Sequence, residues 1–173
     1  MVNVEVGDVN GPEDISEKFI GGPTIAILRV GMGLNFLFAA YDKLRRESYA
    51  ESMDFIFNVH WKDAVHNFYK PFIDAVVLPH LELFAALVTY GELAIAVGLI
   101  FGILTRAAAV AAIFLNLNFI FASGGAILSV NADIGFILLS TILFVGAAGR
   151  SGGVDALLVE WTGPPQDWKR LLY

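Results

Sequence analysis

Three polar side chains inside long apolar stretches mark where this protein would carry out chemistry. Arg29 and Glu92 each stand within an otherwise apolar segment, and Asn116 lies in a run without any charge. A charge at the centre of a membrane-spanning helix costs roughly 2.5 to 3.5 kcal/mol on insertion scales. Such residues normally face the interior of a helix bundle and pair with one another. We therefore expect an ion pair between Arg29 and Glu92.

Two interpretations of this pair are open from the residues alone. In the functional interpretation, Glu92 exchanges protons within the membrane, and Arg29 tunes it or stabilises an anionic intermediate. In the structural interpretation, the two charges only fix the register of the helices, without any turnover. Replacing Glu92 by Gln separates them, because the first predicts a loss of activity and the second a loss of stability or assembly.

A second polar cluster is expected at the other end of the first apolar segment. Helical spacing places Arg29 and Lys43 on one stripe of that segment, with a cation at each end. Glu82 opens the second apolar segment and Asp133 opens the fourth. Antiparallel packing would bring both carboxylates to the membrane level of Lys43, where the cluster would bind a small anion or a lipid headgroup. The alternative is that Lys43 and Arg46 only extend to the membrane interface.

Four apolar segments are long enough to be membrane-spanning helices. The chain has 173 residues, of which 57% are apolar and only 16% charged, and its mean hydropathy is +0.67. A soluble domain carries roughly a quarter of charged residues, and a spanning helix needs about 20 predominantly apolar ones. We therefore predict an all-α, integral membrane four-helix bundle with spans at residues 23–44, 81–104, 107–123 and 131–149.

The other residues form three parts outside the membrane. Residues 1–22 are an acidic extension where a signal peptide would begin with basic residues. Residues 45–80 are a long amphipathic loop between the first and second spans, in which aromatic and charged residues alternate as in helices at a membrane surface. Pro71 and Pro79 divide this loop into two short helical pieces. Residues 150–173 form an interfacial tail.

Positive charges only weakly decide the orientation in the cell membrane. Lysines and arginines are equally frequent on the two sides of the predicted bundle. We place both termini in the cytoplasm, because Arg106 and Arg150 lie in short connections close to the ends of spans. Gly98 and Gly102 form a GxxxG motif, which permits close helix contact either within the bundle or between two copies in a homo-oligomer.

The chain lacks the residues of a resident redox centre. It has no cysteine, which excludes thiolate-ligated iron–sulfur clusters. Histidine is missing from the first, third and fourth spans, so we expect no haem between them, and no phosphate-binding glycine motif points to a flavin. His60 and His66 are six residues apart and do not share a helical face, so we predict no metal site. No basic patch suggests nucleic-acid binding.

Several short motifs follow one another along the chain. They are Arg29-Val30-Gly31, Tyr41-Asp42-Lys43-Leu44, Gly91-Glu92, Val97-Gly98-Leu99, Leu104-Thr105-Arg106-Ala107, Ala148-Gly149-Arg150 and Val154-Asp155-Ala156-Leu157-Leu158. In this order they resemble the DoxX/DoxD family of four-helix membrane proteins over about residues 24–160. The resemblance carries over Arg29, Lys43, Glu92 and Arg106 as the polar motif positions. The long loop and the Gly-Gly-Val-Asp tail look closer to the DoxD branch, which is associated with the membrane subunit of thiosulfate:quinone oxidoreductase.

This resemblance implies a small membrane subunit of a quinone-linked oxidoreductase, as in thiosulfate oxidation. Quinone would be the substrate, and a partner subunit would carry the redox centre, so the resemblance leaves open whether this chain is itself the enzyme. We expect Glu92 and Arg29 as the catalytic pair. The expected quinone-binding residues are Lys43, Glu82, Arg106, Asn116 and Asp133. The alternative is a non-catalytic scaffold or accessory subunit that docks a larger complex through its aromatic loop and its GxxxG surface.

Overall fold

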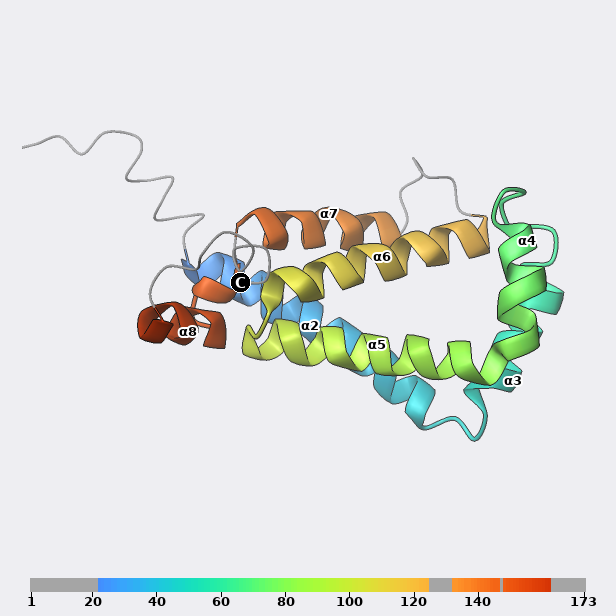
Figure 1. Cartoon of the computed structure of the whole chain (residues 1–173), viewed down its shortest axis with the longest axis horizontal. Helices are drawn as coiled ribbons and strands as arrows, with labels where there is room; N and C mark the ends of the chain where they lie inside the picture. Colours follow the sequence, from blue (N-terminus) through green and yellow to red (C-terminus); the bar gives the residue numbers. More distant parts are fainter. Residues whose placement is uncertain (1–21, 125–131, 147, 163–173) are drawn as a thin grey trace, which may run out of the picture.

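The body of the molecule is a bundle of four apolar helices (Figure 1). The computed structural model describes residues 22–124, 132–146 and 148–162, so the predictions for the acidic extension and for the end of the tail lie outside the described residues. The long helices are α2 (Gly22–Leu44), α5 (Leu81–Phe101), α6 (Thr105–Ser123) and α7 (Ala132–Val145). All regular structure in the described ranges is helical, as predicted.

Three of the described helices are long and apolar enough to cross a membrane. They are α2, α5 together with the helical turns that precede it, and α6. The fourth predicted span is present as the shorter apolar helix α7, which has 14 residues. At 1.5 Å per residue α7 is about 21 Å long, against a hydrocarbon core of about 30 Å. The chain is therefore a multi-pass membrane protein by its three longest helices.

The turn between α5 and α6 begins earlier than the sequence predicts. Gly102 follows α5 with φ +67°, the left-handed conformation that glycine adopts without steric cost. Leu104 precedes α6 and is also left-handed, with φ +48°. Residues 102–104 are thus a tight turn instead of the last residues of the predicted second span, and α6 starts at Thr105.

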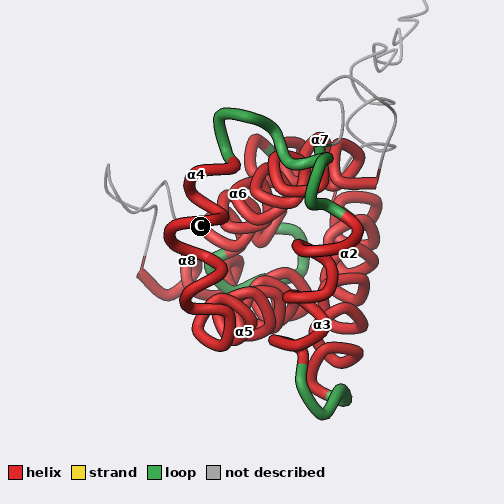
Figure 2. The backbone as a smooth tube through the Cα atoms, turned by 90° about the vertical axis from the view of Figure 1, so that its right-hand side faces the viewer, coloured by secondary structure: helices red, strands yellow, loops and turns green. Residues whose placement is uncertain are grey.

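The helices pack as two pairs, which Figure 2 views nearly along their axes. The most extensive contacts join α2 to α5 and α6 to α7. Gly33 shows how closely the first pair packs, because a Cβ atom added there would lie only 3.1 Å from the Cβ of Leu99. The two pairs meet near the tight turn, where a Cβ at Gly98 would lie 2.9 Å from that of Ala108. Gly98 of the GxxxG motif therefore serves packing within the bundle.

The loop between α2 and α5 folds into two helical pieces that lie across one end of the bundle (Figure 1). The first piece is α3 (Tyr49–Phe55) with the π-helical turn η1 (Ile56–His60). The second is α4 (Lys70–Phe72), the π-helical turn η2 (Ile73–Val77) and the 3-10 turn η3 (Leu78–His80), which leads into α5. Pro71 begins the second piece in the first helical turn, where its missing N–H costs nothing.

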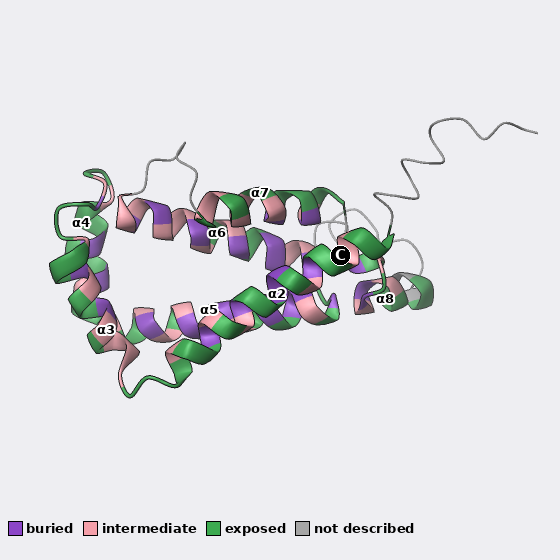
Figure 3. Ribbon diagram, turned by 180° about the vertical axis from the view of Figure 1, so that it is seen from behind, coloured by how far each residue is buried: buried purple, intermediate pink, exposed green. Residues whose placement is uncertain are grey.

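Two apolar cores hold these layers together, and Figure 3 shows the buried residues facing inward. Between the long helices, Met32 and Phe36 of α2 pack with Leu99 of α5. At the end of the bundle, Met53 and Phe57 of the first loop piece pack with residues of η2, α5 and α6. The second core fixes the loop to the bundle, so the loop is an integral part of the folded structure.

The opposite end carries η4 (Ala148–Arg150) and α8 (Val154–Thr162). There η4 contacts the first turns of α2. The first and last described residues therefore lie at the same end of the bundle, as an even number of crossings predicts. We call this the terminal end, and the end covered by α3 and α4 the loop end.

Candidate functional site

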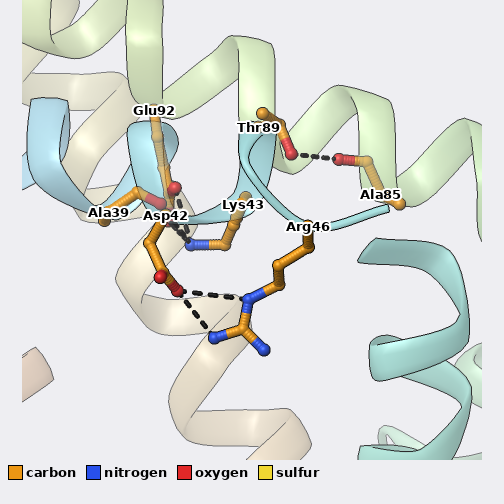
Figure 4. A network of polar contacts seen from close by, with 7 residues as sticks. All are labelled: Ala39, Asp42, Lys43, Arg46, Ala85, Thr89 and Glu92. Atoms are coloured by element: carbon orange, nitrogen blue, oxygen red, sulfur yellow. Dashed lines mark hydrogen bonds and ion pairs between the residues drawn. The ribbon is translucent and has the colours of Figure 1, made fainter. Parts of the chain in front are cut away.

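A buried ion pair joins α2 to α5 close to the loop end (Figure 4). The Nζ atom of Lys43 lies 2.7 Å and 2.8 Å from the two carboxylate oxygens of Glu92. Only 2% of Glu92 is exposed, and Lys43 retains 15% exposure of its side chain. A carboxylate buried in this way needs a close cation, because its desolvation costs several kcal/mol. Lys43 therefore does not extend to the interface as a free cation.

The predicted pairing of Arg29 with Glu92 is wrong, because the axial register of α2 and α5 differs from the one assumed. Gly33 lies against Leu99 and the following residue of α5. Glu92 lies seven residues earlier in α5, about two helical turns nearer the loop end. In an antiparallel pair this places Glu92 level with Ala40, about one turn before Lys43, whose side chain reaches back to it. The same register places Arg29 level with the tight turn after α5.

Arg29 is buried at the terminal end among backbone groups. Only 2% of it is exposed, and its Nη1 donates to the carbonyl of Ala148 over 2.9 Å. A Cβ atom at Gly102 would lie 2.4 Å from Nη1, and one at Gly153 would lie 2.5 Å away. Glycine is therefore required at both positions for the guanidinium to fit. Within the described residues Nε has no hydrogen-bond partner.

The remaining predicted site residues are dispersed, and the expected cluster around Lys43 is not formed. Glu82 is exposed, and Asp133 is half-buried at the start of α7. Arg106 donates from Nε to the carbonyl of Phe144 over 3.0 Å. Asn116 is buried and donates to the carbonyl one turn earlier in its own helix over 2.7 Å. In the described ranges, no three His, Cys, Asp or Glu side chains gather as metal ligands would.

Tyr49 at the start of α3 covers the ion pair. The Nζ atom of Lys43 lies 5.4 Å from the centre of the Tyr49 ring, a cation–π distance. Burial, followed by the charge of Glu92, raises the pKa of Tyr49 to about 12. The sequence analysis missed this residue. The only signal was its place, six residues beyond Lys43 and just after the first span.

The raised pKa gives a spectroscopic prediction. Free tyrosine ionises near pH 10, and we expect the phenol of Tyr49 to ionise near pH 12. The absorbance of phenolate, measured against pH for the native protein and for Tyr49→Phe, should differ by a component with its midpoint near 12. Because the folded state holds this proton more tightly, its contribution to stability is complete below pH 10 and is lost as the pH rises toward 12. A difference component centred near 10 would contradict the burial.

A large apolar cavity lies next to this pair. It has a volume of about 950 Å³, and its walls come from α3, η1, η2, α5 and α6. Tyr49 and Gly91 are both lining residues, and Gly91 immediately precedes Glu92 in α5. Apolar pockets of 300 to 1,000 Å³ with a few polar groups are typical of ligand sites. The cavity was not predictable from sequence, because it results from the divergence of α5 and α6.

The loop end of the cavity is aromatic and carries polar groups. Tyr69 lines it and donates from its hydroxyl to Oδ1 of Asn118, another lining residue. Trp61 and Phe57 also line this end and meet edge to face, with ring centres 5.5 Å apart. A ligand in this part would meet aromatic faces together with the hydroxyls of Tyr49 and Tyr69.

Asp155 is a buried polar residue whose role the sequence analysis did not foresee. It is fully buried at the start of α8, and its carboxylate accepts the backbone N–H groups of Leu104 and Thr105 over 2.8 and 2.9 Å. Leu104 makes no side-chain cap for α6, so Asp155 caps this helix from about 50 residues further along the chain. Its signal was the spacing of the Gly-Gly-Val-Asp motif after the fourth span.

Comparison with protein families places this geometry in a known group. Residues 24–125 match the family model described as DoxX, which is more than half of the chain. The chain belongs to the DoxX family. The match begins in α2 and ends just after α6, so it includes Lys43, Glu92, Tyr49 and the cavity walls. In this DoxX protein the Asp155 cap lies outside the matched residues.

Two further comparisons give no match for this DoxX protein. No curated protein and no solved structure shows significant similarity to the chain. The resemblance expected from the motifs is thus confirmed at the level of the family. What this member does must be argued from its own site.

Proposed function

We propose that this DoxX protein is a membrane subunit of a quinone-linked oxidoreductase, with the redox centre in a partner subunit. The observation that carries this proposal is the apolar cavity, about 950 Å³ in volume, whose lining includes Tyr49, the residue that covers the buried Lys43–Glu92 pair. Lipid-soluble quinones reach their enzymes through the bilayer, and two walls of the cavity are the membrane-crossing helices α5 and α6. Tyr49 belongs to both the cavity wall and the cover of the ion pair.

The proposed chemistry is proton delivery. Reduction of a quinone to a quinol takes up two electrons from the partner and two protons from the protein. Lys43 holds an exchangeable proton on its ammonium group, and the hydroxyl of Tyr49 can relay that proton to a reduced quinone oxygen. Glu92 then takes a proton from the aqueous loop end and returns it to Lys43, and this cycle runs twice for each quinol formed. Arg29 has no part in this sequence, because 14 residues of helix, about 21 Å, separate it from Lys43.

The electron donor and the orientation extend this proposal. Because the chain resembles the DoxD branch, we propose thiosulfate as the electron donor. The partner subunit would oxidise it. We keep both termini in the cytoplasm, since Arg106 and Arg150 lie at the terminal end close to the ends of helices. In this orientation the loop end with Lys43 and Glu92 faces the opposite side of the membrane and draws its protons from there.

Substitution of Glu92 tests the proposal. We expect Glu92→Gln to lower thiosulfate-dependent reduction of a short-chain quinone in native membranes by about 100-fold or more, as for loss of a group that transfers protons. Glu92→Asp keeps the carboxylate and should retain part of the activity. The amount of assembled complex is measured in parallel by affinity purification. Native turnover in assembled Glu92→Gln complex would refute the proposal.

A doubly neutral variant separates chemistry from folding. Lys43→Gln combined with Glu92→Gln leaves no unpaired ion, so we expect it to assemble and still to lack quinone reduction. The matched control is the exposed pair of Lys70 and Asp74, whose atoms approach to 3.1 Å at the surface. Neutralising both of these residues should leave turnover unchanged.

One observation favours the scaffold function instead. Phe55, Val59 and Phe68 of the loop end are each more than half exposed, and exposed apolar groups of this kind mark protein or membrane contacts. A non-catalytic scaffold that docks a partner through this end predicts that Glu92→Gln alters assembly and leaves the turnover of each assembled complex unchanged.

A further inference from the structure

Gly91 occupies a position in α5 that contacts within the protein do not explain. A Cβ atom at Gly91 would meet nothing within 4 Å outside its own stretch of helix, whereas one at Gly98 would collide with Ala108. Glycine in a helix interior is less favourable than alanine. Gly98 has a packing reason for this cost. At Gly91 the open space belongs to the cavity.

The two helices that form the long walls of the cavity, α5 and α6, converge at one end and diverge at the other. Near the tight turn it is lined by Gly98 and Ala108, where α5 and α6 are in contact. Toward the loop end the two helices diverge, and α3 and α4 lie across the gap between them (Figure 1). There Phe57, Trp61 and Tyr69 line the cavity. A thin flexible chain fits the first end, and a flat ring fits the second.

The polar groups are at the loop end. Tyr49 lines the cavity, and a tyrosine hydroxyl can donate a hydrogen bond. The hydroxyl of Tyr69 donates to Asn118 and keeps its own lone pairs. Tyr49 can therefore donate to an oxygen on the edge of a ring. The end near the tight turn, lined by Gly98 and Ala108, offers no hydroxyl of this kind. A ligand with a polar ring and an apolar chain would therefore place its ring at the loop end.

We propose that the cavity binds a lipid-soluble molecule with one oxygen-bearing ring and one flexible apolar chain. The ring lies at the aromatic end, flat against the backbone at Gly91, with an oxygen toward Tyr49. The chain follows Ala107 and Ala111 of α6 toward the tight turn. This inference rests on the proposed function and deepens it, because it assigns the pose of the quinone and makes Gly91 the residue that limits ring size.

The fluorescence of Trp61 tests this pose directly. The chain has three tryptophans, and replacing Trp161 and Trp168 by Phe leaves Trp61 on the cavity wall as the only one. In lipid nanodiscs, decylubiquinone should quench this tryptophan with a saturable dependence on concentration. Gly91→Leu should weaken the apparent affinity about tenfold or more, since its side chain would occupy space that the ring needs.

Matched variants control for folding and for quenching within the bilayer. Gly31→Leu is the control for Gly91→Leu, because Gly31 is also a mid-helix glycine with open space around its Cβ and does not line the cavity. Its affinity should be native. Ala111→Leu fills the cavity from the opposite wall and should weaken binding even where Gly91→Leu fails to fold. A variant that keeps only Trp161 measures quenching by quinone in the bilayer.

The outcomes distinguish this inference from the proposed function. Equal, non-saturable quenching of Trp61 and Trp161, or native affinity in both Gly91→Leu and Ala111→Leu, would overturn the pose. Displacement of the quinone by decanol at equal concentration would assign the cavity to acyl chains and overturn the ring site. Saturable binding that both cavity variants weaken supports the pose even where Glu92→Gln turns over normally, a result that would refute only the proposed proton delivery.

Discussion

Replacing Lys43 by Met is expected to destabilise the folded protein by about 3 to 5 kcal/mol. The variant leaves the carboxylate of Glu92, of which only 2% is exposed, without its ion partner. A buried charge that loses its partner retains its desolvation cost and no longer gains the attraction that offset it. The free energy of unfolding in mixed detergent micelles, measured by denaturant titration, gives this difference.

The double variant provides the decisive comparison. Lys43→Met combined with Glu92→Leu removes both charges, so most of the lost stability should return, because apolar replacements of buried pairs are often neutral or stabilising. Lys70→Met breaks an exposed pair and should cost less than about 1 kcal/mol. Equal losses in Lys43→Met and Lys70→Met would show that the buried pair contributes no more than a surface pair.

Replacing Asp155 by Ala is expected to cost about 3 to 5 kcal/mol, because two charge-assisted hydrogen bonds of about 1.5 to 3 kcal/mol each are lost. The backbone N–H groups of Leu104 and Thr105 would remain without acceptors beside a fully buried side chain. Leu104 already adopts a left-handed conformation, and its φ of +48° is held in place by this cap. Thermal unfolding and the same denaturant titration measure the effect.

A neighbouring residue supplies the control. Glu160 is exposed on α8, the helix that has Asp155 in its first turn, and Glu160→Ala should change stability by no more than about 0.5 kcal/mol. Asp155→Asn should also be strongly destabilising, because the amide nitrogen offers a donor where both neighbours are donors. Native stability in Asp155→Asn would mean that one acceptor is enough for the turn.

The helices were predictable because their apolar runs are long and continuous, but some of their ends were not. Gly102 and Leu104 lie in an apolar stretch, so hydropathy alone extends the predicted span past the true end of α5. The predicted fourth span, residues 131–149, is longer than α7, which ends at Val145. Hydropathy reports the apolar length, whereas backbone conformation decides where the helix ends.

The sequence predicted which residues belong to the candidate site, but it did not predict which cation pairs with Glu92. Glu92 and Lys43 stood out because charges are costly in apolar helices. Which cation meets Glu92 depends on the axial register of α2 and α5, and the contact of Gly33 with Leu99 determines that register. The same register explains why Glu82 does not join Lys43. No periodicity in one helix encodes its displacement along another.

The cap supplied by Asp155 can form only late in synthesis of the chain. A ribosome makes the chain from its amino end, so α5, the tight turn and α6 are synthesised before residue 155 exists. Until then the N–H groups of Leu104 and Thr105 have no carboxylate to receive them. The hairpin of α5 and α6 is therefore capped only once α8, the last helix that the structure describes, has been made. A chain interrupted before α8 is therefore expected to leave the turn between α5 and α6 without its cap.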